Sequence, residues 1–185
     1  MALTKAELRV SLLSQREALS PDTIAYASKK VCRTLSEHPH IQKAQSIAAY
    51  LPFKNELNPW HFIHDCLHQK KNIYIPRYNP ENNSYSLAQL TEKTVFVKGK
   101  YGIPEPGHKS LTLSMEQALT AIEAWVIPGV AFDKTGARLG MGKGYYDRFL
   151  NNSTGLKIGI CFRFQYLESI PQDDWDVKMD TIFSE

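Results

Sequence analysis

Apolar residues recur at helical spacing near the N-terminus. Leu8 and Leu12 fall on one side of the segment 4–15, with charged residues on another. Thr4 and Glu7 have the spacing of a capping box, in which each side chain accepts the other's backbone N–H. The pattern therefore predicts an amphipathic helix that begins at Thr4.

A second helix is expected to begin at Ser20 and Pro21, which suit the N-cap and the first helical position. Apolar residues follow every three or four positions until His38 and Pro39. A residue that precedes proline disfavours helical geometry, so the helix should end there. Together the two segments predict N-terminal helices over about 4–38.

Beyond these helices, short apolar runs alternate with helical patterns. A helix is expected to open at Asn58-Pro59 and another over 144–150, while 98–110, rich in Gly and Pro, should form a long ordered loop. Strands are expected at 46–51, 72–76, 85–90, 124–132 and 157–162, and the final residues should lie near a sheet edge. Strands that alternate with helices predict an α/β fold whose mostly parallel sheet is covered on both faces.

Composition narrows the class of protein. The 185 residues, 43% hydrophobic and 22% charged, fit one globular domain spanning 1–185. A net charge of +3 without a basic run gives no reason to expect a nucleic-acid partner. No apolar run is long enough for a membrane span or a signal peptide, so we expect a cytoplasmic protein without membrane contact. The three cysteines are far apart, which argues against disulfides and a zinc site.

The segment 128–150 carries the clearest chemical signal. Four glycines separate a buried strand from a helix start: Gly136, Gly140, Gly142 and Gly144. Glycines let a backbone approach a ligand closely, and a helix start offers free N–H groups to an anion. Arg138 and Lys143 add full positive charges. We interpret the segment as a phosphate site; a sharp turn with solvated charges is the alternative.

This loop matches neither of two common phosphate-binding motifs. Ala137 occupies the place of the first P-loop glycine, and Gly144 the place of its Ser or Thr. Tyr145 replaces the third glycine of G-x-G-x-x-G. Asp147 lies in the first turn of the following helix, where it can cap that helix or hold Mg²⁺ beside a nucleotide. The sequence leaves both roles open.

The loop RLGMGKGYYDRFL (138–150) resembles the 5-formyltetrahydrofolate cyclo-ligase family, and the resemblance extends over nearly the whole chain. TKAELR (4–9) and YLPFKNEL (50–57) resemble family segments in the same order, as do IPRY, YGIPEPG and DVKMD. The sequence departs from some members at Met141, where they have Arg or an aromatic residue, and at Tyr101, where some have Trp.

The resemblance implies site residues. Lys143 and Arg138 are the implied catalytic cations. Implied ATP contacts are Lys5, Arg9, Arg138, Leu139, Gly140, Met141, Gly142, Lys143, Gly144, Tyr145 and Tyr146. Implied folate contacts are Leu51, Glu56, Met141, Gly142, Lys143, Gly144 and Tyr145. Asp147 and Asp180 are the implied Mg²⁺ ligands. Without the family, Glu56 would read as a loop carboxylate in water.

The resemblance also implies a fold and a reaction. The fold is a three-layer α/β/α sandwich related to sugar-phosphate isomerases and CoA transferases. The reaction is the ATP- and Mg²⁺-dependent conversion of 5-formyltetrahydrofolate to 5,10-methenyltetrahydrofolate, ADP and phosphate. It proceeds through phosphorylation of the formyl oxygen and ring closure by nitrogen 10. We expect the enzyme to act as a monomer with these small molecules as its partners.

Two other functions remain open on the residues alone. The same fold can carry an isomerase or CoA-transferase activity, and the chain could be a nucleotide- or RNA-binding module.

His61, His64 and His68 share one helical face, but no glutamate lies between His64 and His68, so we interpret them as a solvated face rather than a zinc site. Cys66 is interpreted as a core residue rather than a nucleophile.

Overall fold

A central seven-stranded sheet organises the computed structural model, which describes residues 3–142 and 144–185 and only the backbone of Tyr101 and Tyr145. In spatial order its strands are β12 (Thr181–Ser184), β10 (Leu156–Cys161), β7 (Ala124–Pro128), β1 (Ser46–Ala48), β2 (Asn72–Asn79), β3 (Ser84–Leu90) and β6 (Thr112–Leu113). Neighbours from β12 to β2 are parallel, whereas β3 pairs antiparallel with both β2 and β6. The prediction of a mostly parallel sheet is confirmed, and β12 lies at an edge as expected.

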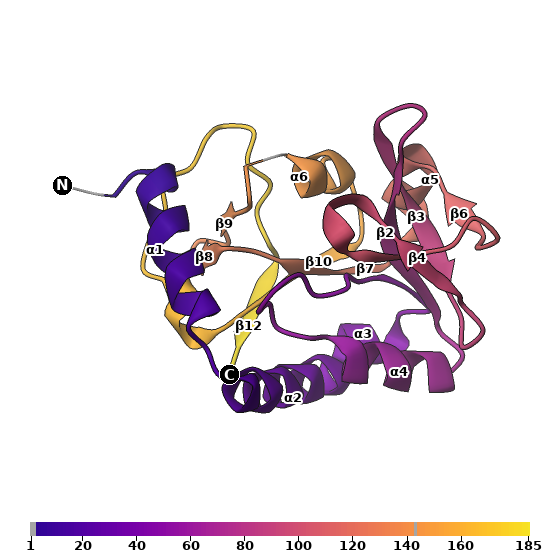
Figure 1. The fold of residues 1–185 in the computed structure, drawn as a ribbon, viewed down its shortest axis with the longest axis horizontal. Helices are drawn as coiled ribbons and strands as arrows, with labels where there is room; N and C mark the ends of the chain where they lie inside the picture. The colour runs from indigo at the N-terminus through magenta and orange to yellow at the C-terminus, as the bar shows by residue number, and fades with distance from the viewer. Residues whose placement is uncertain (1–2, 143) are drawn as a thin grey trace.

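Helices cover both faces of this sheet (Figure 1). On one face lie α2 (Pro21–Glu37), α3 (Pro39–Lys43) and α4 (Trp60–His68); on the other lie α5 (Met115–Ala121) and α6 (Tyr145–Leu150). Successive strand residues supply the two apolar layers: Ile47 and Val126 pack with the first set, Ala48 and Trp125 with the second. This alternation follows from the period of two along a strand. None of the helices described is long and apolar enough to cross a bilayer.

The predicted helix starts are confirmed. Thr4 caps α1 (Lys5–Glu17) through a complete capping box with Glu7. The Ser20 side chain accepts the N–H of Thr23, and Pro21 is the first residue of α2. Both signals are local in the sequence, because a cap satisfies donors within one turn of its own helix.

The N-terminal helix α1 packs away from the main sheet, on a smaller one (Figure 1). That sheet consists of β11 (Tyr166–Leu167), β8 (Ala131–Asp133) and β9 (Arg138–Leu139). Leu8 and Leu12 join Val130, Leu139 and Ile170 in a separate buried cluster. Because this cluster includes Leu139 of β9, α1 packs beside the strand that opens the glycine-rich loop.

The strand predicted at 124–132 is wrong as a single element. β7 ends at Pro128, and β8 starts at Ala131 and joins the smaller sheet. Gly129 lies at the break, where the ring of Phe132 approaches within 2.7 Å of the position that a Cβ would take. Similarly, β1 ends at Ala48 rather than at residue 51.

The loop predicted at 98–110 is also partly wrong. It contains a short helix, η1 (Lys100–Gly102), and a strand, β5 (Pro104–Pro106), that pairs with β4 (Phe96–Lys98). Prolines are tolerated in this two-stranded pair because each strand has a free edge on which a missing N–H costs no ladder bond. A second short helix, η2 (Arg163–Gln165), precedes β11.

Candidate active site

A cavity of about 800 Å³ opens at the carboxyl ends of β1 and β7. Here the chain order reverses, since β2 lies on one side of β1 and the later strand β7 on the other. Diverging connections at such a point leave a crevice in α/β sheets, and ligands commonly bind there. Tyr50 and Leu51, which follow β1, line one part of the cavity, and Gly129 and Val130, which follow β7, line another.

The glycine-rich loop forms one wall of this cavity. At Gly140 a Cβ would lie 2.8 Å from the guanidinium of Arg138, so a side chain there would displace that group. Gly142 and Gly144 have φ angles of +85° and +62°, a region that glycine adopts without strain. Gly144 is also the N-cap of α6. The glycines thus permit a close backbone approach; Lys143 lies outside the described residues.

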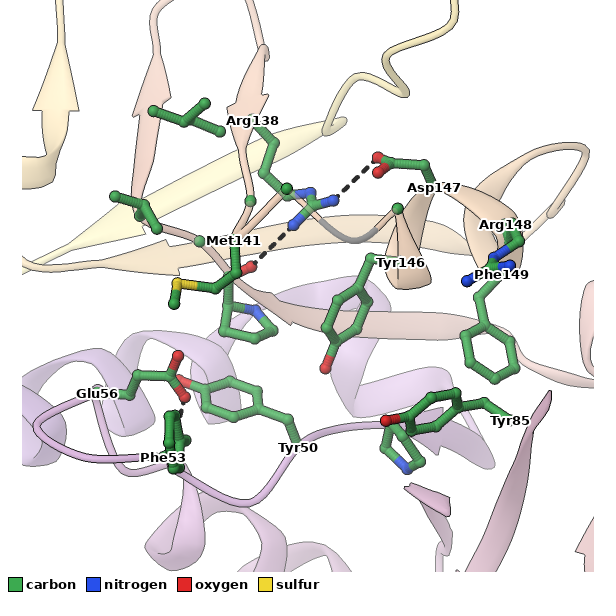
Figure 2. Close-up of a pocket in the computed structure, with 18 of the residues that line it drawn as sticks. Tyr50, Phe53, Glu56, Tyr85, Arg138, Met141, Tyr146, Asp147, Arg148 and Phe149 are labelled. Carbon is green, nitrogen blue, oxygen red and sulfur yellow. Dashed lines mark hydrogen bonds and ion pairs between the residues drawn. The ribbon is translucent and has the colours of Figure 1, made fainter. Parts of the chain in front are cut away.

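Arg138 and Asp147 form an ion pair on this wall (Figure 2). The distance from Arg138 Nη2 to Asp147 Oδ1 is 2.9 Å, and Nη1 donates to the Pro128 carbonyl at 3.4 Å. The guanidinium also lies 5.4 Å from the centre of the Tyr146 ring. Arg138 is only 8% exposed, so its charge faces the cavity from a fixed position.

Two further cations reach the cavity from α1. Arg9 Nε donates to the Gly140 carbonyl at 2.8 Å. Lys5 Nζ lies 2.6 Å from Asp173 Oδ2 and 2.5 Å from Asp176 Oδ2. Burial alone would raise the pKa of Asp176, but its hydrogen bond and charge interaction with Lys5, together with the charge of Arg138, lower it. Asp176 therefore carries a negative charge beside Lys5.

The opposite side of the cavity is apolar around one carboxylate. Glu56 Oε2 accepts the backbone N–H of Phe53 at 2.9 Å, and Oε1 lies 3.5 Å from Nη1 of the buried Arg16. Burial raises the pKa of Glu56, and the Phe53 N–H and Arg16 oppose this rise. In Figure 2, Glu56 and Arg138 lie on opposite sides, with Tyr146 reaching into the space between them.

The structure brings most of the predicted site residues to this one cavity. Those that line it are Lys5, Arg9, Leu51, Glu56, Arg138, Leu139, Gly140, Met141, Gly142, Gly144, Tyr146 and Asp147. Asp180 is placed elsewhere: its carboxylate accepts the backbone N–H of Lys157 at 2.7 Å, between β10 and β12. Within residues 3–142 and 144–185, no group of three or more His, Cys, Asp or Glu side chains is arranged to hold a metal ion.

Several residues near the cavity were not predicted from the sequence. Asp173, Trp175 and Asp176 line it although they lie far along the chain from Lys5. Arg16 contacts Glu56 from the end of α1. No spacing rule links positions so distant. Asp176 is, however, the first residue of the family-like DVKMD segment, and Trp175 directly precedes it, so both could have been considered with that segment.

Comparison with known proteins gives a consistent result. A model of the 5-formyltetrahydrofolate cyclo-ligase family matches residues 2–185. The chain is 30% identical to 5-formyltetrahydrofolate cyclo-ligase of Mus musculus over 192 residues, 98% of this chain and 93% of the relative. It is 33% identical to the enzyme of that name from Haemophilus influenzae over 142 residues, 75% of this chain and 74% of the relative.

Solved structures agree with the sequence matches. The fold resembles 5,10-methenyltetrahydrofolate synthetase of Aquifex aeolicus, with a TM-score of 0.84 and 34% identity, covering 97% of this chain and 89% of the other. It also resembles the synthetase of Mycoplasma pneumoniae, with a TM-score of 0.76 and 26% identity over 98% and 99% of the two chains. The match of the family model over almost the whole sequence, supported by these relatives, shows that the chain belongs to the 5-formyltetrahydrofolate cyclo-ligase family.

Proposed function

We propose that this protein uses ATP to convert 5-formyltetrahydrofolate to 5,10-methenyltetrahydrofolate, ADP and phosphate. One observation carries the proposal beyond family membership: a single cavity has a cationic, glycine-rich wall on one side and a carboxylate in apolar surroundings on the other. The first wall suits a triphosphate, and the second suits a flat heterocycle with N–H donors. Both substrates therefore fit the same space, as group transfer between them requires.

The cationic wall has to bind ATP and direct its terminal phosphoryl group. Arg9 and Arg138 converge on Gly140, one from α1 and the other from β9. Positive groups held this close favour an anion between them, and the start of α6 adds backbone donors. We propose that Arg138 and Lys143 stabilise the charge that develops on the transferred phosphoryl group, since fixed cations act on such charge without reorganising.

The apolar wall has to orient the folate. We propose that Glu56 accepts hydrogen bonds from the pterin amino and ring N–H groups while Tyr50, Leu51 and Phe53 enclose the ring. The formyl oxygen then attacks the terminal phosphorus of ATP, and the bond from that phosphorus to ADP breaks. Nitrogen 10 next attacks the formyl carbon, loses its proton, and the carbon–oxygen bond to phosphate breaks. The products are the methenyl cation, ADP and phosphate.

Two carboxylates of the cavity lining are candidates for holding a magnesium ion. Asp147 pairs with Arg138, and Asp176 lies near enough for the charge of Arg138 to lower its pKa. Magnesium usually takes one or two protein carboxylates together with phosphate oxygens and water. We propose that Asp147 and Asp176 hold it. When bound with ATP, the ion would neutralise phosphate charge. The carboxylate of Asp180, the second ligand that the resemblance implies, accepts the Lys157 N–H. Its role stays a prediction, which the variants below test.

A direct assay tests the proposed function. ATP consumption is measured with and without 5-formyltetrahydrofolate, together with the absorbance of the methenyl product. We expect folate-dependent release of one phosphate for each methenyl product. ATP binding without turnover would favour a nucleotide-binding module, and activity on a sugar phosphate or a CoA ester without ATP would favour the related enzymes. Gel filtration tests the predicted monomeric state.

Glu56→Gln is expected to weaken folate binding and leave ATP binding nearly unchanged. The amide keeps the shape of the side chain but loses a charge-assisted hydrogen bond, which typically costs about 1.5–3 kcal/mol, or roughly 10–150-fold in affinity. Isothermal titration with each ligand measures both effects. An equal loss of affinity for both ligands would reject the assignment of Glu56 to the pterin.

Asp147→Asn and Asp176→Asn are each expected to raise the Mg²⁺ concentration that half-saturates turnover, by about 10-fold, because each removes one anionic oxygen ligand. Asp180→Asn is the matched comparison, since its carboxylate bonds the Lys157 N–H outside the cavity. Turnover is titrated with Mg²⁺ at fixed ATP. If Asp180→Asn shifts the requirement most, the second ligand is Asp180 and not Asp176. If Asp147→Asn lowers the melting temperature without changing the requirement, Asp147 is a structural residue.

A further inference from the structure

Arg16, a charged side chain behind the apolar wall, has no part in the reaction steps proposed above. Arg16 is 1% exposed, near the end of α1, and is among the largest fully buried side chains of the protein. Burying a guanidinium is costly unless it is paired, so a fully buried arginine needs a reason. Its charged partner is Glu56, whose Oε1 lies 3.5 Å from Nη1. Among the described residues, Arg16 Nε has no hydrogen-bond partner.

The contacts of Glu56 divide between its two oxygens. Oε2 accepts the N–H of Phe53, which fixes one edge of the carboxylate to its own loop. Oε1 is held only by Arg16 among the contacts described. Glu56 lines the cavity, whereas Arg16 lies behind it and does not. Arg16 therefore reaches a ligand only through Glu56.

The same loop is attached to α1 by further contacts. The Asn55 side chain donates to the carbonyls of Arg16 and Glu17 at 3.3 and 3.2 Å. Lys54 pairs with Glu17 at 3.0 Å, although this pair is largely exposed and contributes little. The position of the loop thus depends on the end of α1, while the start of α1 carries Lys5 to the other wall.

We propose that Arg16 is a positioning residue for folate recognition, which holds the Glu56 carboxylate charged and turned toward the pterin from outside the cavity. The proposal rests on the assignment of Glu56 to the folate in the proposed function. A carboxylate in an apolar wall accepts hydrogen bonds best when it is ionised, and burial opposes ionisation. Arg16 provides a positive charge that opposes this effect of burial, and it contacts Glu56 from outside the cavity that Glu56 lines.

The inference differs from a purely structural role in its effect on kinetics. A buried arginine that only supports the fold would affect folate and ATP alike when removed. A residue that acts through Glu56 should affect the KM for folate, and it should lose that effect once Glu56 is already changed. Contacting residues that act as one unit give strongly non-additive double mutants.

The test compares Arg16→Met, Arg16→Lys, Glu56→Gln and the double variant Arg16→Met/Glu56→Gln. Arg33→Met is the matched control, because Arg33 also pairs with a glutamate but on the exposed surface of α2. For each variant, the KM values for 5-formyltetrahydrofolate and ATP, kcat and the melting temperature are measured. Arg16→Lys keeps a charge and guards against a failure of Arg16→Met to fold.

We expect Arg16→Met to raise the folate KM at least ~10-fold, with the ATP KM within ~3-fold of the unchanged enzyme. Arg16→Lys should give a smaller rise, since a lysine keeps the charge but not the planar fork. In the Glu56→Gln background, removing Arg16 should change the folate KM less than ~3-fold. Equal effects on both substrates, or full additivity in the double variant, would overturn the inference. If the unchanged protein forms no methenyl product, the proposed function fails instead.

Discussion

Lys143→Ala is expected to lower turnover with ATP at least ~100-fold, the scale that follows removal of a preorganised charge stabiliser. Lys143 lies between Gly142 and Gly144 in the sequence, and both glycines have backbone angles that allow a tight approach to a ligand. Gly142 is also close to Arg9, whose guanidinium lies 3.6 Å from where a Gly142 Cβ would be. Lys143 of this loop and Arg9 of α1 are thus expected to bind the same anion.

The melting temperature separates this role from a structural one. A lysine between two glycines has no bulky sequence neighbours, and surface substitutions usually change stability by less than about 0.5 kcal/mol. Lys134→Ala is a suitable control, because Lys134 pairs with Glu168 on the exposed surface and does not line the cavity. Lys5→Ala should reduce turnover less than Lys143→Ala, because the charge of Lys5 is already paired with Asp173 and Asp176. A Lys143→Ala enzyme with full activity would contradict the assignment of phosphate chemistry to this loop.

Local signals in the sequence correctly predicted those elements whose start depends only on neighbouring residues. The capping box of Thr4 and Glu7 and the Ser20-Pro21 start are both present, because a helix cap is complete within one turn. The division of 124–132 into two strands was not predictable in this way. It depends on which sheet each half joins, and an apolar run gives no information on that choice.

The candidate site shows the same division between local and distant contacts. The glycine-rich loop was readable because its charges and glycines occupy adjacent positions. The partners of Lys5 and Glu56 were not, since Asp176 is 171 positions from Lys5 and Arg16 is 40 positions from Glu56. A charged residue that is buried beside a distant partner has no signature of its own in one sequence. The family-like DVKMD segment begins with Asp176, which lines the cavity, and ends with Asp180, which accepts the Lys157 N–H. The role of Asp180 in holding Mg²⁺ stays a prediction.

Arg138→Met is expected to reduce turnover by at least ~100-fold and also to lower the stability of the fold. The guanidinium links β9, the Pro128 carbonyl and Asp147, so its loss leaves both acceptors without this donor. Leaving a partly buried acceptor unsatisfied costs about 1–3 kcal/mol, which thermal denaturation would detect. Arg138→Lys keeps the charge but not the two-pronged geometry, and it should fall between Arg138→Met and the unchanged enzyme in both measurements.

A double variant decides whether Arg138 acts on ATP or only anchors Asp147. If anchoring is its whole role, Arg138→Met should add little to Asp147→Asn in turnover, because the pair is already broken. If Arg138 contacts the phosphates, the double variant should lose much more activity than Asp147→Asn, even at saturating Mg²⁺. We expect the second result, since Arg138 lies next to Gly140 on the wall to which Arg9 also turns its guanidinium. Equal kcat in Asp147→Asn and the double variant would remove Arg138 from the catalytic machinery and leave it as a support for α6.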